Sequence, residues 1–175
     1  MKNGFLKVAV TTPDLRVADC EYNKNQMVEK VKKMAGEKVS LVCFPEFSLT
    51  GYTCGDLFLH DTLVEGAKDA LAAYCEETKS YEIVSVVGLP LDHNGKLYNV
   101  AAVLCRGEVL GFVPKTYLPN YNEFYEARHF ARGMADPVEV DFVGECVPMG
   151  PRLIFVSSSL PALKIGAEVC EGLWT

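Results

Sequence analysis

Apolar runs and one stretch of helical periodicity alternate along the first part of the chain. Residues 6–11 and 39–44 are continuous apolar or β-branched runs of strand length, and we predict a strand for each. Between these runs, apolar residues recur every three or four positions until Gly36, which is the pattern of an amphipathic helix. Asn23 is predicted to cap this helix, because Gln26 follows three residues later and completes a variant of the capping box. The order of strand, helix and strand predicts a β-α-β unit.

The middle of the chain predicts a second helix, a series of hairpins and a long loop. Thr62 and Glu65 form another capping box, and an apolar stripe at helical spacing follows them. Hairpin turns around Asn94 and Gly107 separate three predicted strands, at residues 83–89, 97–104 and 109–113. Residues 116–134 are rich in aromatic side chains and too long for a simple connection, so we treat them as a candidate site loop.

Two more strands are predicted near the end, at residues 153–157 and 162–170, with a turn around Pro161 between them. Residues 47–59 are rich in Gly, Thr and aromatic side chains and are predicted to form a loop. Neither an internal repeat nor a linker divides the sequence. Six or seven strands against two helices, with a β-α-β start and later hairpins, predict an α/β fold in which helices cover one face of a mixed sheet.

Composition and charge narrow the range of functions. Hydrophobic residues make up 49% of the chain and charged residues 23%, which is typical of a globular protein. The formal net charge is −6 and no basic stripe is present, so we expect no nucleic-acid partner. The seven cysteines include no CxxC pair, which argues against a disulfide framework and a structural zinc site. With no secretory signal and no apolar run of bilayer length, we expect a cytoplasmic protein without a membrane partner.

Three chemically capable residues stand at the predicted ends of buried strands: Glu46, Lys115 and Cys170. Strand ends fix the backbone while freeing the side chain, so reactive groups gather there in sheet-based enzymes. A thiol attacks as the thiolate and needs a base and a cation, which Glu46 and Lys115 would supply. If the three converge, the predicted chemistry is acyl transfer, with Cys170 attacking an amide carbonyl. Taken singly, each residue has a simpler interpretation, as a solvated carboxylate, a loop lysine or a small apolar side chain.

A cysteine and histidine pair is the competing arrangement. His60 precedes the second helix, His93 lies in a predicted hairpin turn, and His129 lies in the aromatic loop. None of the three has the flanking sequence of a cysteine protease, and surface positions account better for His60 and His93. His129 is the one histidine placed to line the candidate site.

Three segments resemble the catalytic blocks of the nitrilase, or carbon–nitrogen hydrolase, superfamily. They are FPEFSLTGY at 44–52, PKTYLPNY at 114–121 and EVCE at 168–171. Two longer segments are similar to the glutaminase domains of glutamine-dependent NAD+ synthetases, namely GYTCGDLF at 51–58 and KTYLPNYNEFYE at 115–126. The resemblance covers the chain from about Leu6 to its last residue.

This resemblance implies an α/β fold of the nitrilase type, an α-β-β-α sandwich that is incomplete at the C-terminus in this chain. Residues 1–175 would be the N-terminal portion of a glutaminase (amidotransferase) domain, with the ATP-dependent synthetase domain absent from the chain. The glutaminase step would need no cofactor and no metal, and ATP and Mg2+ would serve only the synthetase domain. No phosphate-binding GxxxxGK[ST] loop occurs in the sequence. The implied partners are glutamine, the synthetase domain and further copies in a homo-oligomer.

Residue roles are implied in the same way. Glu46 would be the base, Lys115 the oxyanion partner and Cys170 the nucleophile, so that glutamine is cleaved to glutamate and to ammonia for the amidation of deamido-NAD+. Glu126 would be a carboxylate that balances the lysine. The resemblance assigns four residues to the glutamine pocket: Tyr52, Tyr121, Phe124 and Glu171.

Several alternatives stay open on the sequence. The aromatic residues Tyr52, Tyr121 and Phe124 have a simpler interpretation as packing residues of a loop. Gly172 departs from the resemblance, because an aspartate usually stands there, and the loss of its carboxylate is expected to loosen the turn behind Cys170. The whole chain is also compatible with a free-standing amidase or nitrilase acting on another small amide, or with a non-catalytic module that binds a partner.

Overall fold

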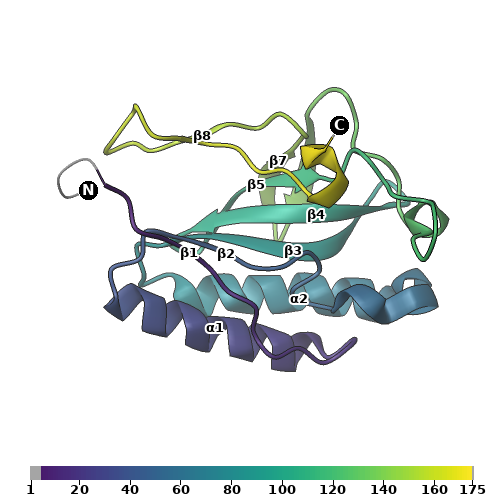
Figure 1. The fold of residues 1–175 in the computed structure, drawn as a ribbon, viewed down its shortest axis with the longest axis horizontal. Coiled ribbons are helices and arrows are strands. Elements are labelled where there is room, and N and C mark those ends of the chain that lie inside the picture. The colour runs from purple at the N-terminus through teal and green to yellow at the C-terminus, as the bar shows by residue number, and fades with distance from the viewer. Residues whose placement is uncertain (1–4, 175) are drawn as a thin grey trace.

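The computed structural model describes residues 5–174, and its main layer is a mixed sheet (Figure 1). Seven strands lie in the order β1-β2-β3-β4-β5-β7-β6. Parallel pairing joins β1 to β2, β2 to β3 and β5 to β7, and the other neighbours are antiparallel. The strand bounds are β1 Val8–Val10, β2 Leu41–Cys43, β3 Val84–His93, β4 Lys96–Cys105, β5 Glu108–Pro114, β6 Val138–Phe142 and β7 Glu145–Met149. The predicted mixed sheet is therefore confirmed.

Two long helices, α1 (Cys20–Gly36) and α2 (Asp61–Thr78), lie side by side against one face of the sheet (Figure 1). Their inner stripes are fully buried, as Val31 on α1 and Leu71 on α2 illustrate with 0% exposure. Removal of this apolar surface from water is what holds the helix layer to the sheet. The prediction that helices cover one face is confirmed. Neither α1 nor α2, nor any other helix within residues 5–174, has the length and apolar character needed to cross a bilayer.

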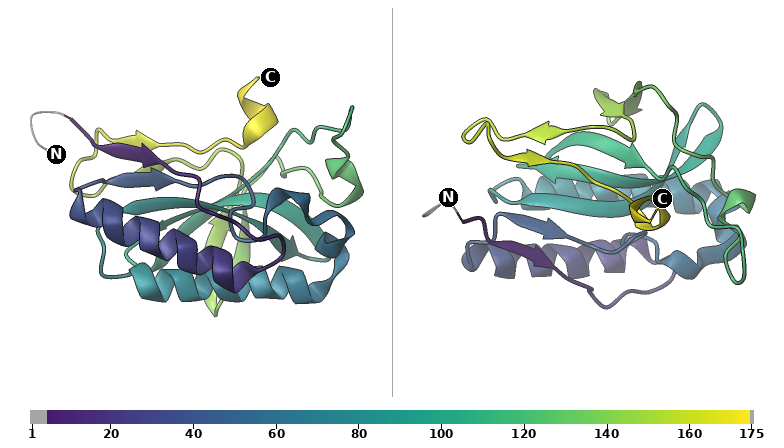
Figure 2. Two further views of the ribbon diagram at one scale, coloured as in Figure 1. Left: turned by 60° about the horizontal axis from the view of Figure 1, so that its bottom comes forward. Right: turned by 45° about the horizontal axis from the view of Figure 1, so that its top comes forward.

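The opposite face of the sheet is only partly covered. The last described segment crosses this face and contains a two-stranded sheet of β8 (Phe155–Val156) and β9 (Lys164–Ile165) (Figure 2). Val169, from the same segment, packs into a small apolar cluster on β4 and β5. Farther along the face, Val8 and Val10 of β1 are 59% and 85% exposed. This edge of the layer therefore presents apolar side chains to solvent.

Both predicted helix caps are wrong. The cap of α1 is Asp19, whose Oδ1 accepts a hydrogen bond from the backbone N–H of Tyr22 at 3.1 Å. Asn23 lies inside the helix and is fully buried. Its side-chain amide bonds to the backbone N–H and carbonyl oxygen of Arg16, which precedes the helix, and to the carbonyl oxygen of Leu49, in the turn after Glu46. The second helix begins at Asp61 after an extended N-cap residue, His60, so Thr62 already lies within the first turn.

The remaining differences concern short elements. The predicted strand at 162–170 is reduced to β9, because β8 offers it only two residues to pair with. The hairpin of β6 and β7 is not among the predicted elements. The predicted loop at 47–59 contains the kinked 3-10 helix η1 (Tyr52–Leu59), and the loop at 116–134 contains only the short 3-10 helix η2 (Glu126–Arg128).

Candidate active site

Glu46 is held in a tight turn at the C-terminal end of β2. Within the turn, the N–H of Ser48 donates to the carbonyl oxygen of Pro45 at 3.1 Å. The hydroxyl of Ser48 accepts a hydrogen bond of 3.1 Å from the N–H of Gly88, on β3. Only glycine fits there, because a Cβ on Gly88 would lie 2.4 Å from the backbone nitrogen of Phe47. The neighbouring strand therefore fixes the position from which Glu46 extends.

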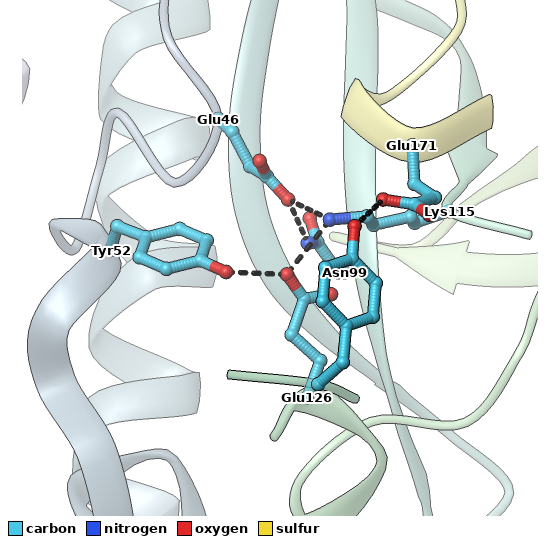
Figure 3. Close-up of polar contacts among 7 residues, drawn as sticks. Glu46, Tyr52, Asn99, Lys115, Glu126 and Glu171 are labelled. Carbon is cyan, nitrogen blue, oxygen red and sulfur yellow. Dashed lines mark hydrogen bonds and ion pairs between the residues drawn. The ribbon is translucent and has the colours of Figure 1, made fainter. Parts of the chain in front are cut away.

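Lys115 follows β5 directly and is anchored to β4. Its backbone N–H donates to the carbonyl oxygen of Asn99 at 2.8 Å, and its side chain is completely buried. The ammonium lies between two carboxylates, with Nζ 2.8 Å from Glu46 Oε1 and 2.8 Å from Glu126 Oε1 (Figure 3). The structure thus brings together Glu46, Lys115 and Glu126, which the sequence separates by up to 80 positions.

The charges of this cluster do not cancel. Glu46 and Glu126 share one ammonium, so the three side chains carry a net charge of −1 when all are ionised. Burial alone would lower the pKa of Lys115, but the hydrogen bonds and charges of Glu126 and Glu46 outweigh it, and the net shift is upward. Lys115 is therefore a cation. Two of its three ammonium protons are used by the carboxylates, which leaves the third for another acceptor.

Glu126 is fixed from a second direction by Tyr52. The phenol of Tyr52 donates a 2.6 Å hydrogen bond to Glu126 Oε1 (Figure 3). Burial, and then this bond and the charge of Glu126, raise the pKa of Tyr52 far above its ordinary value, so the phenol stays protonated. Glu126 is 6% exposed, and its other oxygen, Oε2, is buried without a hydrogen-bond partner among residues 5–174. The predicted pocket residue Tyr52 therefore contacts the charged cluster itself.

A further ion pair ties η1 to η2. Arg128 donates two hydrogen bonds to the carboxylate of Asp56, at 2.8 and 2.9 Å. His129 Nε2 lies 3.0 Å from Asp56 Oδ1. These contacts hold the segment of Tyr52 against the segment of Glu126. They also account for His129, whose ring nitrogen is directed at a carboxylate.

Cys170 begins the 3-10 helix η3 (Cys170–Leu173) and has a left-handed backbone, with φ of 50°. A non-glycine residue in this region is strained, and such strain is concentrated at functional turns. The predicted break of the chain at Cys170 is confirmed, although the residue before it is extended backbone rather than part of a strand. Cys170 is exposed, whereas most cysteines of the chain are buried or half-buried.

The thiol of Cys170 lies within the field of the charged cluster. Burial raises its pKa, as do the charges of Glu46 and Glu126, whereas the charge of Lys115 and the backbone N–H of Glu171 lower it. The net shift is upward, so the resting thiol is protonated and needs a base before it can attack. The charged groups that act on it are the lysine and the two glutamates, and no histidine is among them.

The predicted pocket residues lie around this cluster. Tyr121 donates a 2.9 Å hydrogen bond to Glu171 Oε2, beside Cys170, and its ring meets that of Phe124 edge-on at 5.9 Å. Phe124 and Tyr52 line a cavity of about 180 Å³ that also reaches Glu126. Tyr121 is 52% exposed, so it is not a core packing residue. The structure therefore places Tyr52 and Phe124 beside Glu126, and Tyr121 and Glu171 beside Cys170, and the roles of these residues stay predictions.

Asn99 belongs to the cluster and has no place in the sequence motifs. Its Nδ2 donates a 2.6 Å hydrogen bond to Glu46 Oε1 (Figure 3), and the residue is 1% exposed. The sequence does contain one indication of its importance, since Asn99 is an amide side chain inside the apolar run at 97–104. A buried strand does not tolerate such a polar group without a hydrogen-bond partner. The partner is Glu46, which lies in the turn after β2.

Gly172 leaves room for a neighbouring side chain. A Cβ at this position would lie 1.9 Å from Glu168 Oε1, so the Glu168 side chain occupies the space beside the turn.

Elsewhere, a hollow of about 500 Å³ lies between α2 and the β6–β7 hairpin and contains none of the predicted site residues. Within residues 5–174, no group of three or more His, Cys, Asp or Glu side chains is placed to hold a metal ion.

The chain is similar to known proteins of one family. Residues 7–175 match the family described as carbon–nitrogen hydrolase. The chain belongs to the carbon–nitrogen hydrolase family. This carbon–nitrogen hydrolase chain is 36% identical over 173 residues to a glutamine-dependent NAD(+) synthetase of Mycobacterium tuberculosis, with 99% of the chain and 26% of that protein covered. It thus spans about a quarter of the length of the curated relatives it matches.

Solved structures confirm the predicted fold class. The carbon–nitrogen hydrolase chain superposes on a glutamine-dependent NAD(+) synthetase from Cytophaga hutchinsonii with a TM-score of 0.87 and 26% identity, covering 95% of this chain and 28% of that one. An amidase from Nesterenkonia sp. has a TM-score of 0.65 at 18% identity, with 85% and 56% of the two chains covered. The amidase likeness concerns the fold alone.

Proposed function

We propose that this chain hydrolyses the side-chain amide of glutamine to glutamate and ammonia through a thioester on Cys170. The observation that carries the proposal is Lys115, a fully buried cation held between Glu46 and Glu126 whose charge acts on the exposed thiol. A single carboxylate would already pair a buried lysine of purely structural role, whereas Lys115 has two. Support for glutamine as the substrate comes from the names of the relatives, which are glutamine-dependent NAD(+) synthetases.

In the first half of the reaction, Glu46 removes the proton of the Cys170 thiol, and the sulfur bonds to the amide carbon. The carbonyl oxygen becomes an oxyanion, which the third proton of the Lys115 ammonium and the N–H of Glu171 would stabilise. Loss of one such donor typically costs about 3 to 4 kcal/mol of barrier. Glu46 then returns the proton to the amide nitrogen as the carbon–nitrogen bond breaks, and ammonia leaves a thioester behind.

In the second half, Glu46 takes a proton from water while the water oxygen attacks the thioester carbon. The carbon–sulfur bond breaks, the sulfur recovers its proton from Glu46, and glutamate is released. The buried ion pairs of Lys115 keep the ammonium and the base in one geometry through both halves, so neither step requires a new arrangement of the protein.

The pocket residues would recognise the amino-acid part of the substrate. Glu171 presents a carboxylate, oriented by Tyr121, that suits the α-ammonium group of glutamine. The rings of Phe124 and Tyr52 would flank the aliphatic part of the side chain. The net negative charge of the Glu46, Lys115 and Glu126 cluster also favours a substrate end that carries N–H donors and no negative charge.

We further propose that residues 1–175 are the N-terminal portion of a glutaminase domain in a longer, homo-oligomeric protein. A synthetase domain would use the ammonia, with ATP and Mg2+, to amidate deamido-NAD+. The relatives support this proposal, because the chain matches only 26% of the length of the M. tuberculosis protein. We keep the cytoplasm as the predicted location, since the proposed reaction requires a reduced Cys170.

The direct test is ammonia release from glutamine by the intact protein and by Cys170→Ala, with Cys146→Ala as the matched control, since Cys146 is the other exposed cysteine. We expect Cys170→Ala to lose the activity and Cys146→Ala to keep it. Full activity of Cys170→Ala would refute the thioester mechanism. A panel of other small amides, hydrolysed better than glutamine, would instead point to a general amidase.

A further inference from the structure

Asn99 joins the two charged residues of the proposed mechanism through two different groups. Its side-chain Nδ2 donates to Glu46 Oε1 at 2.6 Å, and its backbone carbonyl oxygen accepts the N–H of Lys115 at 2.8 Å. Asn99 lies on β4, paired with Pro90 of β3 and followed by the first residue of β4 that pairs with β5. One rigid position of the sheet therefore sets the distance between Glu46 and Lys115 (Figure 3).

The amide of Asn99 has only one orientation that its surroundings allow. Asn99 Oδ1 is buried and has no hydrogen-bond partner among the described residues. Exchanging the amide nitrogen and oxygen would press Oδ1 against the carboxylate oxygen of Glu46 and leave the nitrogen without an acceptor. The amide therefore donates to Glu46, and the unpaired oxygen is a cost of that arrangement.

The two oxygens of Glu46 are consequently in different situations. Oε1 accepts both Lys115 Nζ and Asn99 Nδ2, whereas Oε2 has no hydrogen-bond partner among the described residues. The Glu46 side chain is 19% exposed, so Oε2 is accessible from the site. An oxygen that already accepts two N–H donors is a poor proton acceptor, and the free oxygen is the better one.

We infer that Asn99 is a positioning residue that, with Lys115, occupies Oε1 of Glu46 and so leaves Oε2 as the atom that takes the Cys170 proton. This inference rests on the proposed thiol mechanism. When Oε2 is protonated, Oε1 keeps both donors, so the carboxyl group stays oriented and can return the proton to the leaving nitrogen. The side-chain hydrogen bond of Asn99 goes to Glu46, so Asn99 would act through that carboxylate.

The test compares Asn99→Leu and Asn99→Asp in the intact protein. Leucine keeps the volume and removes the donor, whereas aspartate keeps the shape and places a second carboxylate against Glu46. The control is Thr78→Val, because Thr78 is also buried but its hydroxyl donates to the carbonyl oxygen of Tyr74 within α2. Thermal unfolding shows which variants are folded, and either Asn99 variant alone decides the question.

Two pH profiles are measured: kcat/KM for glutamine, and the rate at which iodoacetamide alkylates Cys170 without substrate. A carboxylate that loses a charge-assisted donor holds its proton more tightly, about tenfold or more, so the acid limb for Asn99→Leu should move up by about one pH unit. The limb for Asn99→Asp should move further, and that for Thr78→Val should stay in place. Folded Asn99 variants with the wild-type acid limb would overturn the inference. If glutamine is not hydrolysed at all, the proposed substrate is wrong, and the alkylation profile still tests Asn99.

Discussion

Replacement of Gly88 by alanine tests whether β3 determines the position of Glu46. A Cβ at Gly88 would lie 2.4 Å from Phe47 N, 2.9 Å from Pro45 O and 3.0 Å from the carbonyl carbon of Glu46. All three atoms are backbone, so no side chain can rotate away. The shortest contact falls about 1 Å below an ordinary one, and the turn must move by about that amount or the strands must separate.

The expected effects follow from that displacement. Overpacking of a tight site costs about 1 to 3 kcal/mol of unfolding free energy. A shift of about 1 Å in the turn would also spoil the 2.8 Å contact of Glu46 with Lys115, and misplacement on this scale costs about 100-fold in rate. Urea unfolding and ammonia release from glutamine measure the two effects separately.

The matched control is Gly66→Ala in α2, where an added Cβ meets no atom within 4 Å. Alanine is the better helix former, so this variant should gain up to about 1 kcal/mol and keep its activity. If Gly88→Ala is as stable and as active as the wild type, the turn is more adaptable than its backbone contacts indicate, and the argument that β3 positions Glu46 is wrong.

Three other outcomes are expected. Lys115→Met removes the cation from between the buried Glu126 and the half-buried Glu46 and should cost about 3 to 5 kcal/mol in urea unfolding; a loss below about 1 kcal/mol would show that the carboxylates are solvated. In Glu46→Gln, alkylation of Cys170 by iodoacetamide at neutral pH should slow, because the base is gone and burial still raises the pKa of the thiol, although the variant also removes the Glu46 charge that raises that pKa; a wild-type rate would exclude Glu46 as the base. The isolated 175-residue chain should self-associate in sedimentation experiments, since Val8 and Val10 expose apolar surface at the sheet edge, and a monomer with full glutaminase activity would contradict this.

Sequence patterns predict well the strands that are buried on both faces, because nearly all of their residues are apolar. Residues 83–89 and 97–104 are apolar runs packed on both sides, and they form the two central strands β3 and β4. The β6–β7 hairpin escapes prediction although Val138, Val140 and Phe142 alternate, because Glu145 and Pro148 interrupt the apolar pattern of the partner strand β7. The alternation of apolar and polar residues at 138–142 is the pattern that could have predicted β6.

The helix caps fail for a tertiary reason. Asn23 satisfies the local rule for a cap, but its amide is used across the fold by Leu49, and Asp19 takes over at the helix start. Local rules cannot anticipate such competition, because the competing acceptor comes from a distant segment.

The site shows the same division. Glu46, Lys115 and Cys170 can be identified from their positions just beyond predicted strands and from the family resemblance. Asn99 cannot be identified in this way, because its contact with Glu46 depends on the registers of β3, β4 and β5, and no local pattern contains that information.

The attachment of the last segment has a consequence for how the protein is made. The seven strands, and the turn and loop that carry Glu46, Lys115 and Glu126, all precede residue 150. Cys170 lies on a later segment, which is joined to them through the Val169 cluster and the Tyr121 hydrogen bond. During translation the amine and both acids therefore emerge from the ribosome ahead of the sulfur. A nascent chain is therefore expected to show no thiol-dependent activity until the segment that carries Cys170 packs against the sheet.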